Sequence, residues 1–348
     1  MSTISRRTVI GGLAAAGASS VFGAPSIVIA AGLKEKVPVV VGSEHALVYL
    51  PWDVAKALGY FDAEGLDVEI TYTKGGSEAA TALASGTCDY SGNAIDHAIA
   101  AAERGKSLVM IADFMNQPGI AVMVRPADRE KYKTFADFKG KTIGVTSIGS
   151  ATHVLATWMG HRAGLGKDDL KIVGVGGGAT MISALSGNQV DAAYGNDPYA
   201  TTLIKTGRGV QWLGLYTSAD TRRALGFREY CFTGALTRGE VIQKNPERTQ
   251  KIVNALVRAQ KFMATRTSAQ IAAALSDEFR GGTPQADWAA SYSHSRPAYT
   301  QYGTIALDGV RAVMETNNYF LGASSKVDPA KLYDNTFVDN ALRQAHAR

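Results

Sequence analysis

Two segments of this sequence resemble each other at a constant spacing of 102 residues, and this repeat constrains the fold more than any other feature. Residues 75–89 (GGSEAATALASGTCD) and residues 177–191 (GGATMISALSGNQVD) share a glycine pair, an Ala-Leu pair and a final aspartate at matching positions. Two copies cannot form a solenoid, which needs roughly three or more stacked units. They are sufficient for two similar lobes that face each other across a cleft.

Both copies lie in a region where short hydrophobic runs alternate with Ala-rich segments of helical spacing. This alternation predicts an α/β fold with mostly parallel strands. From Pro246 onward the sequence changes to consecutive amphipathic helices, with the proline near a first helical position. Strands are expected at residues 37–42, 66–73, 87–92, 107–114, 119–125, 141–146, 170–175, 190–195 and 210–216.

The composition indicates a folded protein with no nucleic-acid partner. With 348 residues and 46% hydrophobic content, the chain can bury a large core, and its length suggests about two domains. The net charge is +5, and the basic residues are scattered rather than grouped with aromatic residues. Cys88 and Cys231 lie in strand-like runs, so we expect buried free thiols, with one disulfide as the alternative outside the cytoplasm.

The N-terminus has the features of an export signal. The run SRRTVI (residues 5–10) precedes a weakly hydrophobic segment without a charge before Lys34, and it resembles a twin-arginine signal. Pro25 and the many Gly and Ala residues argue against a membrane anchor. We expect residues 1–31 to be cleaved and the mature protein to be soluble in the periplasm.

Small and hydroxyl residues follow the predicted strands of both copies. In open parallel sheets, ligands bind beyond the carboxyl ends of the strands. A glycine-containing turn lets the backbone approach a ligand, and the following helix offers free N–H groups and a favourable dipole. The sequence therefore predicts one cleft lined by residues 43–45, 75–77 and 92–96 of the first copy and residues 147–152, 176–180 and 195–199 of the second.

Several runs in one order resemble the solute-binding proteins of ABC importers in the nitrate, sulfonate, taurine and thiamine-precursor group. The resemblance covers nearly all of the mature chain. It departs from the family pattern at Asp197-Pro198, where Glu-Pro is usual, so a carboxylate is retained on a shorter side chain. The runs are PWDVAKALGYFDAEGLDVEI (residues 51–70), GGSEAATALASGTCDYSG (75–92), FADFKGKTIGV (135–145) and NQVDAAYGNDPYA (188–200).

The resemblance implies a two-lobed, periplasmic-binding-protein-like clamshell of type II, in which each lobe is a mixed sheet flanked by helices. It also implies that the chain crosses between the lobes near residues 125–127 and 215–227, and that the lobes close about these crossings when a solute binds. The implied partners are a small-molecule solute and the transmembrane permease of an ABC importer, and we expect a monomer. The expected first lobe is residues 36–125 and 223–348, and the second is residues 126–222.

The resemblance and the predicted cleft loops together give candidate residues for solute binding. Ser147, Ser150 and Thr152, with the backbone N–H groups of Gly149 and Ala151, would donate hydrogen bonds to an anionic head group. The alternative is that these hydroxyls only cap the helix.

Other loop residues have two possible roles as well. Ser77 would bind from the opposite lobe or cap a helix, and Asp197 would accept from the solute or cap the helix that Pro198 begins. The remaining candidates are Glu44, His45, Gly76, Asn93, Asp96, Asn196 and Tyr199.

Enzyme classes have weaker support. Gly174, Gly176 and Ala179 approximate a dinucleotide-binding fingerprint, with Asp197 about 20 residues further on, but Tyr72 occupies the position of Gly174 in the first copy. The sequence has no GxSxG, HExxH or P-loop motif, and its six histidines have no metal-ligand spacing. The resemblance extends to enzymes that make the thiamine pyrimidine with a cysteine-rich iron-binding run, which is absent here. We expect a carrier without cofactor or metal.

The predicted cleft loops limit the charge of the solute. Lys74 is the one cation among them, which disfavours a desolvated dianion relative to a monoanion, a zwitterion or a neutral heterocycle. Sulfonates, taurine-like compounds and aromatic acids fit this condition. The alternatives are a pyrimidine-binding protein and, less favoured, an enzyme on the same fold that makes a pyrimidine.

Overall fold

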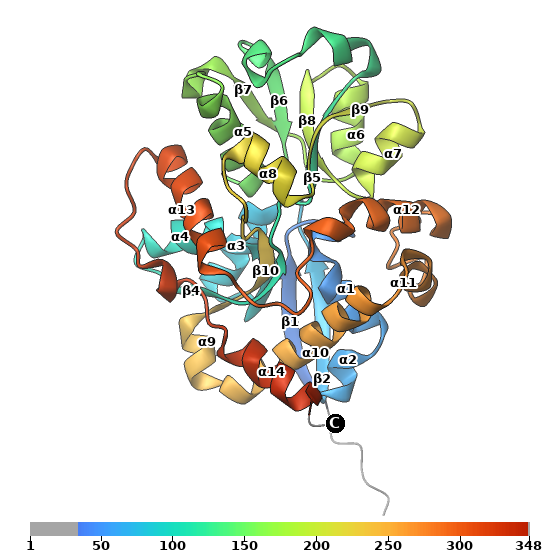
Figure 1. Cartoon of the computed structure of the whole chain (residues 1–348). Coiled ribbons are helices and arrows are strands. Elements are labelled where there is room, and N and C mark those ends of the chain that lie inside the picture. The colour runs from blue at the N-terminus through green and yellow to red at the C-terminus, as the bar shows by residue number, and fades with distance from the viewer. Residues whose placement is uncertain (1–33, 347–348) are drawn as a thin grey trace, which may run out of the picture. The chain divides into compact units, whose positions relative to one another are not determined.

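The computed structural model describes residues 34–346, which form ten strands in two five-stranded sheets with helices around them (Figure 1). Each sheet is mixed, as predicted for the two-lobed α/β fold. The predicted export signal, residues 1–31, lies outside the described residues. Within residues 34–346, no helix combines the length and the hydrophobicity that a membrane crossing requires.

The first sheet combines strands from distant parts of the chain in the order β2-β1-β3-β10-β4. β1 is parallel to both β2 and β3, whereas β10 is antiparallel to β3 and β4. β4 is an edge strand, yet all of its residues are buried, because the C-terminal segment covers its free edge through bridges from Met110 to Tyr333 and from Met115 to Tyr299. The strands are β1 (Glu35–Val41), β2 (Leu66–Tyr72), β3 (Tyr90–Ala94), β4 (Leu108–Met115) and β10 (Thr233–Arg238).

The second sheet has the same plan, with the order β7-β6-β8-β5-β9. β6 is parallel to β7 and β8, and β5 is antiparallel to β8 and β9. β3 and β8 are 102 residues apart at both of their ends, so the sequence repeat corresponds to equivalent strands of the two sheets. The strands are β5 (Ile120–Val124), β6 (Thr142–Val145), β7 (Lys171–Gly174), β8 (Ala192–Asn196) and β9 (Val210–Leu215).

The chain passes between the sheets twice, between β4 and β5 and between β9 and β10. The first passage occupies residues 116–119, ahead of the residues 125–127 that were predicted from the sequence. β5 is a fully buried hydrophobic strand, and such a run carries no local signal for the sheet that it joins. The second passage occupies residues 216–232.

Helices cover both sheets. Long helices from the C-terminal part pack on the first sheet: α10 begins at Pro246, as predicted, and contacts α1, α2 and α14 (Figure 1). The helices are α1 (Leu50–Ala57), α2 (Tyr60–Ala63), α3 (Gly76–Ser85), α4 (Asp96–Ala102), α5 (Ala151–Arg162), α6 (Ala179–Ser186), α7 (Tyr199–Lys205), α8 (Ser218–Leu225), α9 (Gly239–Lys244), α10 (Pro246–Thr265), α11 (Ser268–Ala274), α12 (Gln285–Ser295), α13 (Leu307–Leu321) and α14 (Thr336–His346). Short 3₁₀ helices are η1 (Leu47–Tyr49), η2 (Pro126–Lys131), η3 (Phe135–Phe138), η4 (Lys167–Asp169), η5 (Arg296–Ala298) and η6 (Pro329–Lys331).

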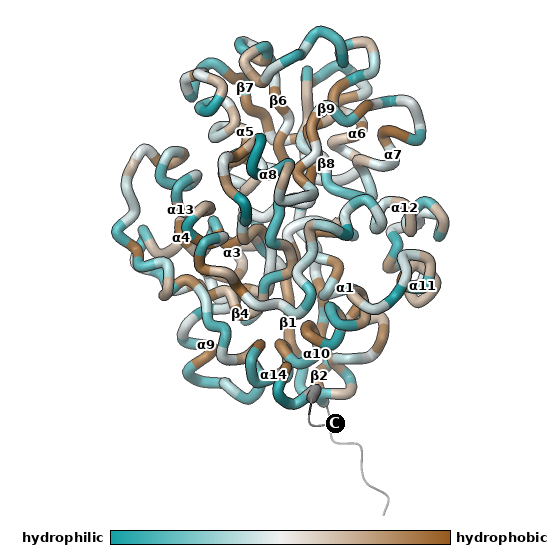
Figure 2. The backbone as a smooth tube through the Cα atoms, viewed as in Figure 1, coloured by the Kyte–Doolittle hydropathy of each residue, from teal (hydrophilic) through white to brown (hydrophobic). Residues whose placement is uncertain are grey.

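The core lies between the sheets and these helices. In Figure 2 the strands carry long hydrophobic stretches, whereas hydrophilic residues are frequent on the outer helices and loops. Trp52 and Trp288 are fully buried. Cys88 and Cys231 are buried free thiols, as predicted, and burial raises the pKa of Cys88 to about 11.

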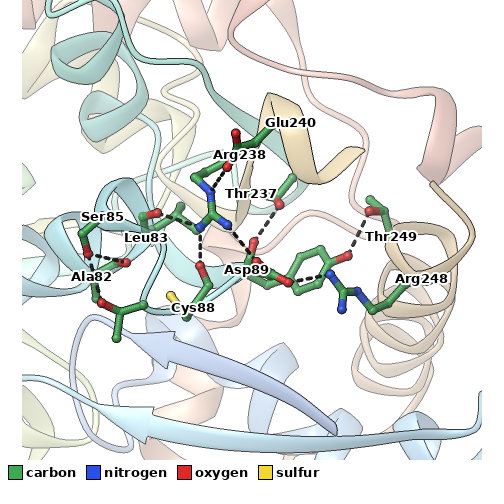
Figure 3. Close-up of polar contacts among 12 residues, drawn as sticks. Ala82, Leu83, Ser85, Cys88, Asp89, Thr237, Arg238, Glu240, Arg248 and Thr249 are labelled. Carbon is green, nitrogen blue, oxygen red and sulfur yellow. Dashed lines mark hydrogen bonds and ion pairs between the residues drawn. The ribbon is translucent and has the colours of Figure 1, made fainter. Parts of the chain in front are cut away.

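An arginine fixes the repeated loop of the first lobe from the end of its antiparallel strand. Arg238, the last residue of β10, donates to the carbonyl oxygens of Leu83 at 2.9 Å and Cys88 at 2.5 Å. It also forms an ion pair of 2.8 Å with Asp89, the final aspartate of the repeat (Figure 3). These bonds hold the segment between α3 and β3.

The second lobe repeats this arrangement with another arginine, and its acceptors lie 102 residues after those of the first lobe. Arg125, directly after β5, donates to the carbonyl oxygens of Leu185 at 3.4 Å and Val190 at 2.5 Å and lies 3.8 Å from Asp191. Two arginines that are far apart in the sequence therefore make equivalent contacts, which supports the equivalence of the two lobes beyond strand order.

Candidate functional site

Parallel strands of both sheets end around one cavity of about 30 Å³, which we call the inner cavity. This volume is sufficient for about two water molecules or for a head group of similar size. Its lining comes from the segments after β1, β2, β3, β6 and β8 and from the crossing segments. The lining residues are Gly42, Ser43, Val48, Tyr49, Gly76, Ala94, His97, Ile120, Thr146, Ser150, Ala151, Thr152, Asn196 and Phe232.

A group of three hydroxyls lies at the N-terminus of α5. Thr146 Oγ1 donates to Ser150 Oγ at 2.9 Å, and the hydroxyls of Ser150 and Thr152 are 2.9 Å apart. Thr152 Oγ1 also accepts from the backbone N–H of Thr146 at 3.0 Å, so these hydroxyls fix the β6–α5 turn. All three residues line the inner cavity, and a hydroxyl that accepts within the turn still has a proton to donate. Capping and solute binding are therefore compatible here.

On the opposite lobe, His97 of α4 lines the inner cavity, and it is one of several lining residues, among them Tyr49 and Thr146, that were not predicted from the sequence. Its Nδ1 lies 2.8 Å from Asp96 Oδ1, and both side chains are buried. Burial lowers the pKa of His97, but the charge of Asp96 and the hydrogen bond that Asp96 accepts from the ring outweigh burial and raise that pKa overall. The available signal was an acidic residue followed by histidine directly after a strand end.

Two polar atoms beside this cavity lack partners. His97 Nε2 and Asn196 Oδ1 are buried and have no hydrogen-bond partner among residues 34–346. His97 comes from the first lobe and Asn196, the last residue of β8, from the second. A buried polar atom without a partner costs roughly 1–3 kcal/mol, so such atoms call for a ligand or water.

A larger space of about 640 Å³, the outer groove, adjoins the inner cavity. Ser43 and Thr146 line both spaces. The outer groove is lined on one side by the segments after β1 and β2, including Glu44, Lys74 and Glu78, and on the other by residues 174–180 and Tyr199. Its volume is within the range of about 300–1,000 Å³ typical of small-molecule sites.

The two lobes touch at the glycine loops and at Tyr199. Ser77 Oγ donates to the carbonyl of Ile148 at 3.2 Å and lies 3.2 Å from Ser147 Oγ. Tyr199 donates to the carbonyl of Glu44 at 3.1 Å. Ser77 therefore spans the two lobes in this conformation, whereas Glu44, Ser147 and Tyr199 line the outer groove.

Several predicted site residues have side chains that are directed elsewhere. Asn93 donates to the carbonyl of Gly76 at 3.1 Å and accepts from Ala94, so it fixes the glycine loop. His45 has a φ of 48° and packs against Tyr72, with ring centroids 5.3 Å apart. Neither side chain lines the inner cavity or the outer groove. The same holds for Gly149, whose N–H donates to His153, and for Asp96, whose carboxylate contacts His97.

Asp197 is the largest departure from the expected placement, because its carboxylate faces the C-terminal helices. One oxygen accepts from the N–H of Thr201 at 3.0 Å and from its hydroxyl at 2.7 Å, which corresponds to the capping role. The other accepts from Ser295 at 2.8 Å and lies 3.0 Å from His294 Nδ1. Asp197 is fully buried and links α7 of the second lobe to α12 of the first.

No group of three or more His, Cys, Asp or Glu side chains within residues 34–346 is arranged to hold a metal ion. Cations are also scarce at the site: among the described residues that line the inner cavity, none is Lys or Arg. The polar groups that converge here are hydroxyls, one amide and one histidine.

Comparison with known proteins gives a family match over most of the chain. A family model described as NMT1/THI5 like matches residues 43–268. A putative binding protein of Brucella abortus (strain 2308) is 27% identical over 210 residues, which cover 60% of this chain and 61% of that protein. The 4-amino-5-hydroxymethyl-2-methylpyrimidine phosphate synthase THI11 of Saccharomyces cerevisiae is 24% identical over 220 residues, which cover 62% of this chain and 63% of the synthase. The chain thus matches less than two thirds of the length of both relatives.

Solved structures match over a greater length. A protein from Bordetella bronchiseptica RB50 has a TM-score of 0.83 and 30% identity, over 90% of this chain and 98% of that one. The nitrate-binding protein NrtA from Synechocystis PCC 6803 has a TM-score of 0.73 and 14% identity, over 90% of both chains. The alkanesulfonate-binding protein SsuA from Xanthomonas axonopodis pv. citri, bound to MOPS, has a TM-score of 0.67 and 19% identity, over 88% of this chain and 97% of SsuA. At these identities, the last two likenesses concern the fold.

Proposed function

Because this chain belongs to the NMT1/THI5-like family, we propose that it is the solute-binding protein of an ABC importer. In this proposal the protein is exported to the periplasm, with residues 1–31 as a twin-arginine-type signal. It acts there as a monomer, holds a small organic anion or zwitterion between its lobes and delivers it to the transmembrane permease. No bond of the solute is broken.

The observation that carries this proposal is the inner cavity. It lies between two lobes of equivalent topology, and each lobe contributes one lining residue that has an unpartnered buried polar atom, His97 with Nε2 and Asn196 with Oδ1. A site divided between lobes lets a bound solute stabilise the closed form through contacts that the open form lacks. The SsuA and NrtA structures support the proposal because proteins of those names share this fold.

The lining chemistry supports a solute with one negative charge at most. The hydroxyls of Thr146, Ser150 and Thr152 and the N-terminus of α5, a helix of 12 residues, favour a negative group. Full desolvation of two negative charges would need compensating cations, and the inner cavity has no Lys or Arg among its described residues. A sulfonate or carboxylate head group satisfies these conditions, and Lys74 and Glu44 in the outer groove would contact the rest of the solute.

A second candidate is a protein that binds or makes a pyrimidine. The similarity to the yeast synthase THI11 and the THI5-like description of the matching family model favour it. The uncharged ring of a pyrimidine could also use Asn196 and the hydroxyls. The two candidates differ in whether the ligand carries a charge and in whether it is recovered unchanged.

A thermal-shift panel with the mature protein tests this proposal. The panel contains nitrate, methanesulfonate, taurine, MOPS, benzoate and 4-amino-5-hydroxymethyl-2-methylpyrimidine. A ligand that binds only the folded state raises the melting temperature as its concentration exceeds the dissociation constant. We expect a sulfonate or carboxylate to give the largest rise and to be recovered unchanged by mass spectrometry.

Two serine variants test the role of the inner cavity. Ser150→Ala removes a hydroxyl that lines the cavity, and the control Ser183→Ala removes one on the exposed side of α6. Ser150→Ala should weaken binding about tenfold, the order expected for one hydrogen bond to a charged group, while Ser183→Ala leaves binding unchanged. Conversion of a panel compound by the protein, or a melting temperature that no panel compound raises, would contradict the carrier proposal.

A further inference from the structure

The orientation of the His97 ring at the inner cavity is fixed by neighbouring residues. It lines the cavity and is 8% exposed, its Nδ1 lies 2.8 Å from Asp96 Oδ1, and its Nε2 is buried without a partner among residues 34–346. Gly76 leaves the space for the ring, since a Cβ there would lie 3.1 Å from His97 Cε1. The ring orientation is thus fixed from two sides.

We propose that His97, oriented by Asp96, is the cationic group that binds the head of the solute, and that the protein therefore recognises a monoanion and takes up a proton on His97 with it. The inference rests on the proposed carrier function, and it narrows the solute to one chemical class. From the opposite lobe, the side-chain N–H of Asn196, rather than its Oδ1, would donate to the same head group.

The protonation state of the His97 ring determines whether Nε2 offers a lone pair or an N–H group to a bound solute. Asp96 is an acceptor when ionised, so Nδ1 of His97 carries a proton and Nε2 is the atom that changes with pH. A neutral ring directs a lone pair at the cavity, which repels an anion. A protonated ring directs an N–H there and forms a charge-assisted hydrogen bond.

The net charge explains the preference for a monoanion. The protonated His97 and the ionised Asp96 sum to zero, and one anionic head group then adds a single charge in a space without Lys or Arg among the described lining residues. A dianion would add two charges to a buried site, at much greater desolvation cost.

Few charged or titratable side chains face His97. Within residues 34–346, Asp96 is the one ionisable side chain that shifts the pKa of His97, and the net direction is upward. Tyr49 of η1 and Tyr230, in the segment before β10, lie near Asp96, and burial raises the pKa of both, so they remain neutral. Asn93 of β3 and Gly76 of α3 carry no charge.

This arrangement predicts the direction in which anion affinity changes with pH. Because the pKa of His97 is raised above its ordinary value near 6.5, the cationic form persists to a higher pH than it would in a free imidazole. Anion affinity should be constant below that pKa and should fall about tenfold per pH unit above it, since binding then requires one proton.

Calorimetric titration of the full mature chain between pH 5.5 and 9 tests the inference. The probes are methanesulfonate and benzoate, each with an uncharged counterpart, methanesulfonamide and benzamide. For the wild type we expect tighter binding of the anions, the stated fall in affinity at high pH, and uptake of up to one proton per anion, measured in two buffers of different ionisation enthalpy.

Variants separate the roles of the pair. His97→Gln should weaken anion binding by roughly 30-fold or more at pH 6 and abolish its pH dependence. Asp96→Asn still accepts from Nδ1, but it removes the charge that raises the pKa, so the fall in affinity should begin at lower pH. His161→Gln is the matched control, since that ring stacks on Tyr319 with centroids 4.0 Å apart and does not line the inner cavity.

Two results would overturn the inference while leaving the carrier function intact. One is anion affinity that does not change between pH 5.5 and 9 in the wild type, a measurement that needs no variant to fold. The other is preferential binding of an uncharged probe or of the pyrimidine, with His97→Gln binding as tightly as wild type. Failure of every probe and every panel compound to bind would instead reject the carrier function and this inference together.

Discussion

The turns after β3 and after β8 occupy equivalent places in the two lobes, 102 residues apart, but they direct their acidic residues differently. In the first lobe, Asp96 orients His97 towards the inner cavity. In the second lobe, Asp197 turns away and binds Ser295 of α12. Of these two turns, one thus holds a histidine at the proposed binding site and the other links the two lobes.

The glycine loops, in contrast, remain alike. A Cβ added at Gly75 would lie 2.8 Å from Ser147 Oγ of the second lobe, and one added at Gly177 would lie 2.7 Å from Ser43 Oγ of the first. The close approach of the lobes is therefore nearly symmetric, while the histidine that lines the inner cavity comes from one lobe. Variants at His97 and Asp197, and at Gly75 and Gly177, test whether the two lobes differ in this way.

Asp197→Ala should have the largest effect, on stability. The substitution removes the acceptor of three hydrogen bonds and the partner of His294, and leaves buried donors unpaired, so we expect the free energy of unfolding to fall by about 2–4 kcal/mol. Urea unfolding monitored by circular dichroism measures the change. Solute affinity should fall less than it does in His97→Gln.

The control for this variant is Asp287→Ala at the same α7–α12 contact. Asp287 pairs with Lys205 at the surface, with both side chains more than 40% exposed (45% and 42%), so its loss should cost less than about 1 kcal/mol. If Asp197→Ala were as stable as Asp287→Ala, the buried link between the lobes would not contribute to the free energy of unfolding.

The contrast between His97 and Asp197 shows what the sequence could predict. The repeat, the strand runs and the loops at strand ends predicted two α/β lobes and a cleft that contains Ser150, Thr152 and Asn196, the family resemblance predicted the mixed sheets, and the antiparallel strand β10 was not predicted. The direction of Asp197 depends on Ser295, almost 100 residues later, and no local pattern contains that contact.

The crossing before β5 was unpredictable for the same reason. Its residues form a buried hydrophobic strand that suits either sheet, and pairing with β8 and β9 decides the outcome. His97 differs, because the Asp-His pair after β3 was visible in the sequence. Its importance depends on an orientation that only the three-dimensional structure provides.

Gly75→Ala and Gly177→Ala should have an intermediate effect, on affinity, and the two effects should be similar. Each added methyl would crowd a serine of the other lobe in the closed form, while an open form would accommodate it. Overpacking of this kind costs about 1–3 kcal/mol, and because a short serine side chain can adjust, we expect roughly tenfold weaker binding. Calorimetry with the tightest panel ligand measures it.

Gly166→Ala is the control for these glycine variants. Gly166 has an ordinary φ of −74°, and a Cβ there would meet Asp169 Oδ2 at 3.6 Å, a normal contact within the same lobe. It should leave affinity unchanged. A loss for Gly75→Ala without a similar loss for Gly177→Ala would show that the closure is asymmetric and would break the equivalence of the glycine loops.

Ser77→Ala should have the smallest effect, and it makes the first lobe resemble the second, where Ala179 occupies the equivalent position. Ser77 contacts Ile148 and Ser147 across the lobes at an exposed site, so its hydroxyl exchanges protein for water contacts at little net cost, about 0.5 kcal/mol or less. We expect affinity to change less than about threefold, as measured with the same ligand. A tenfold loss would instead indicate that Ser77 binds the solute directly, as the sequence suggested, and that the solute extends past the glycine loops.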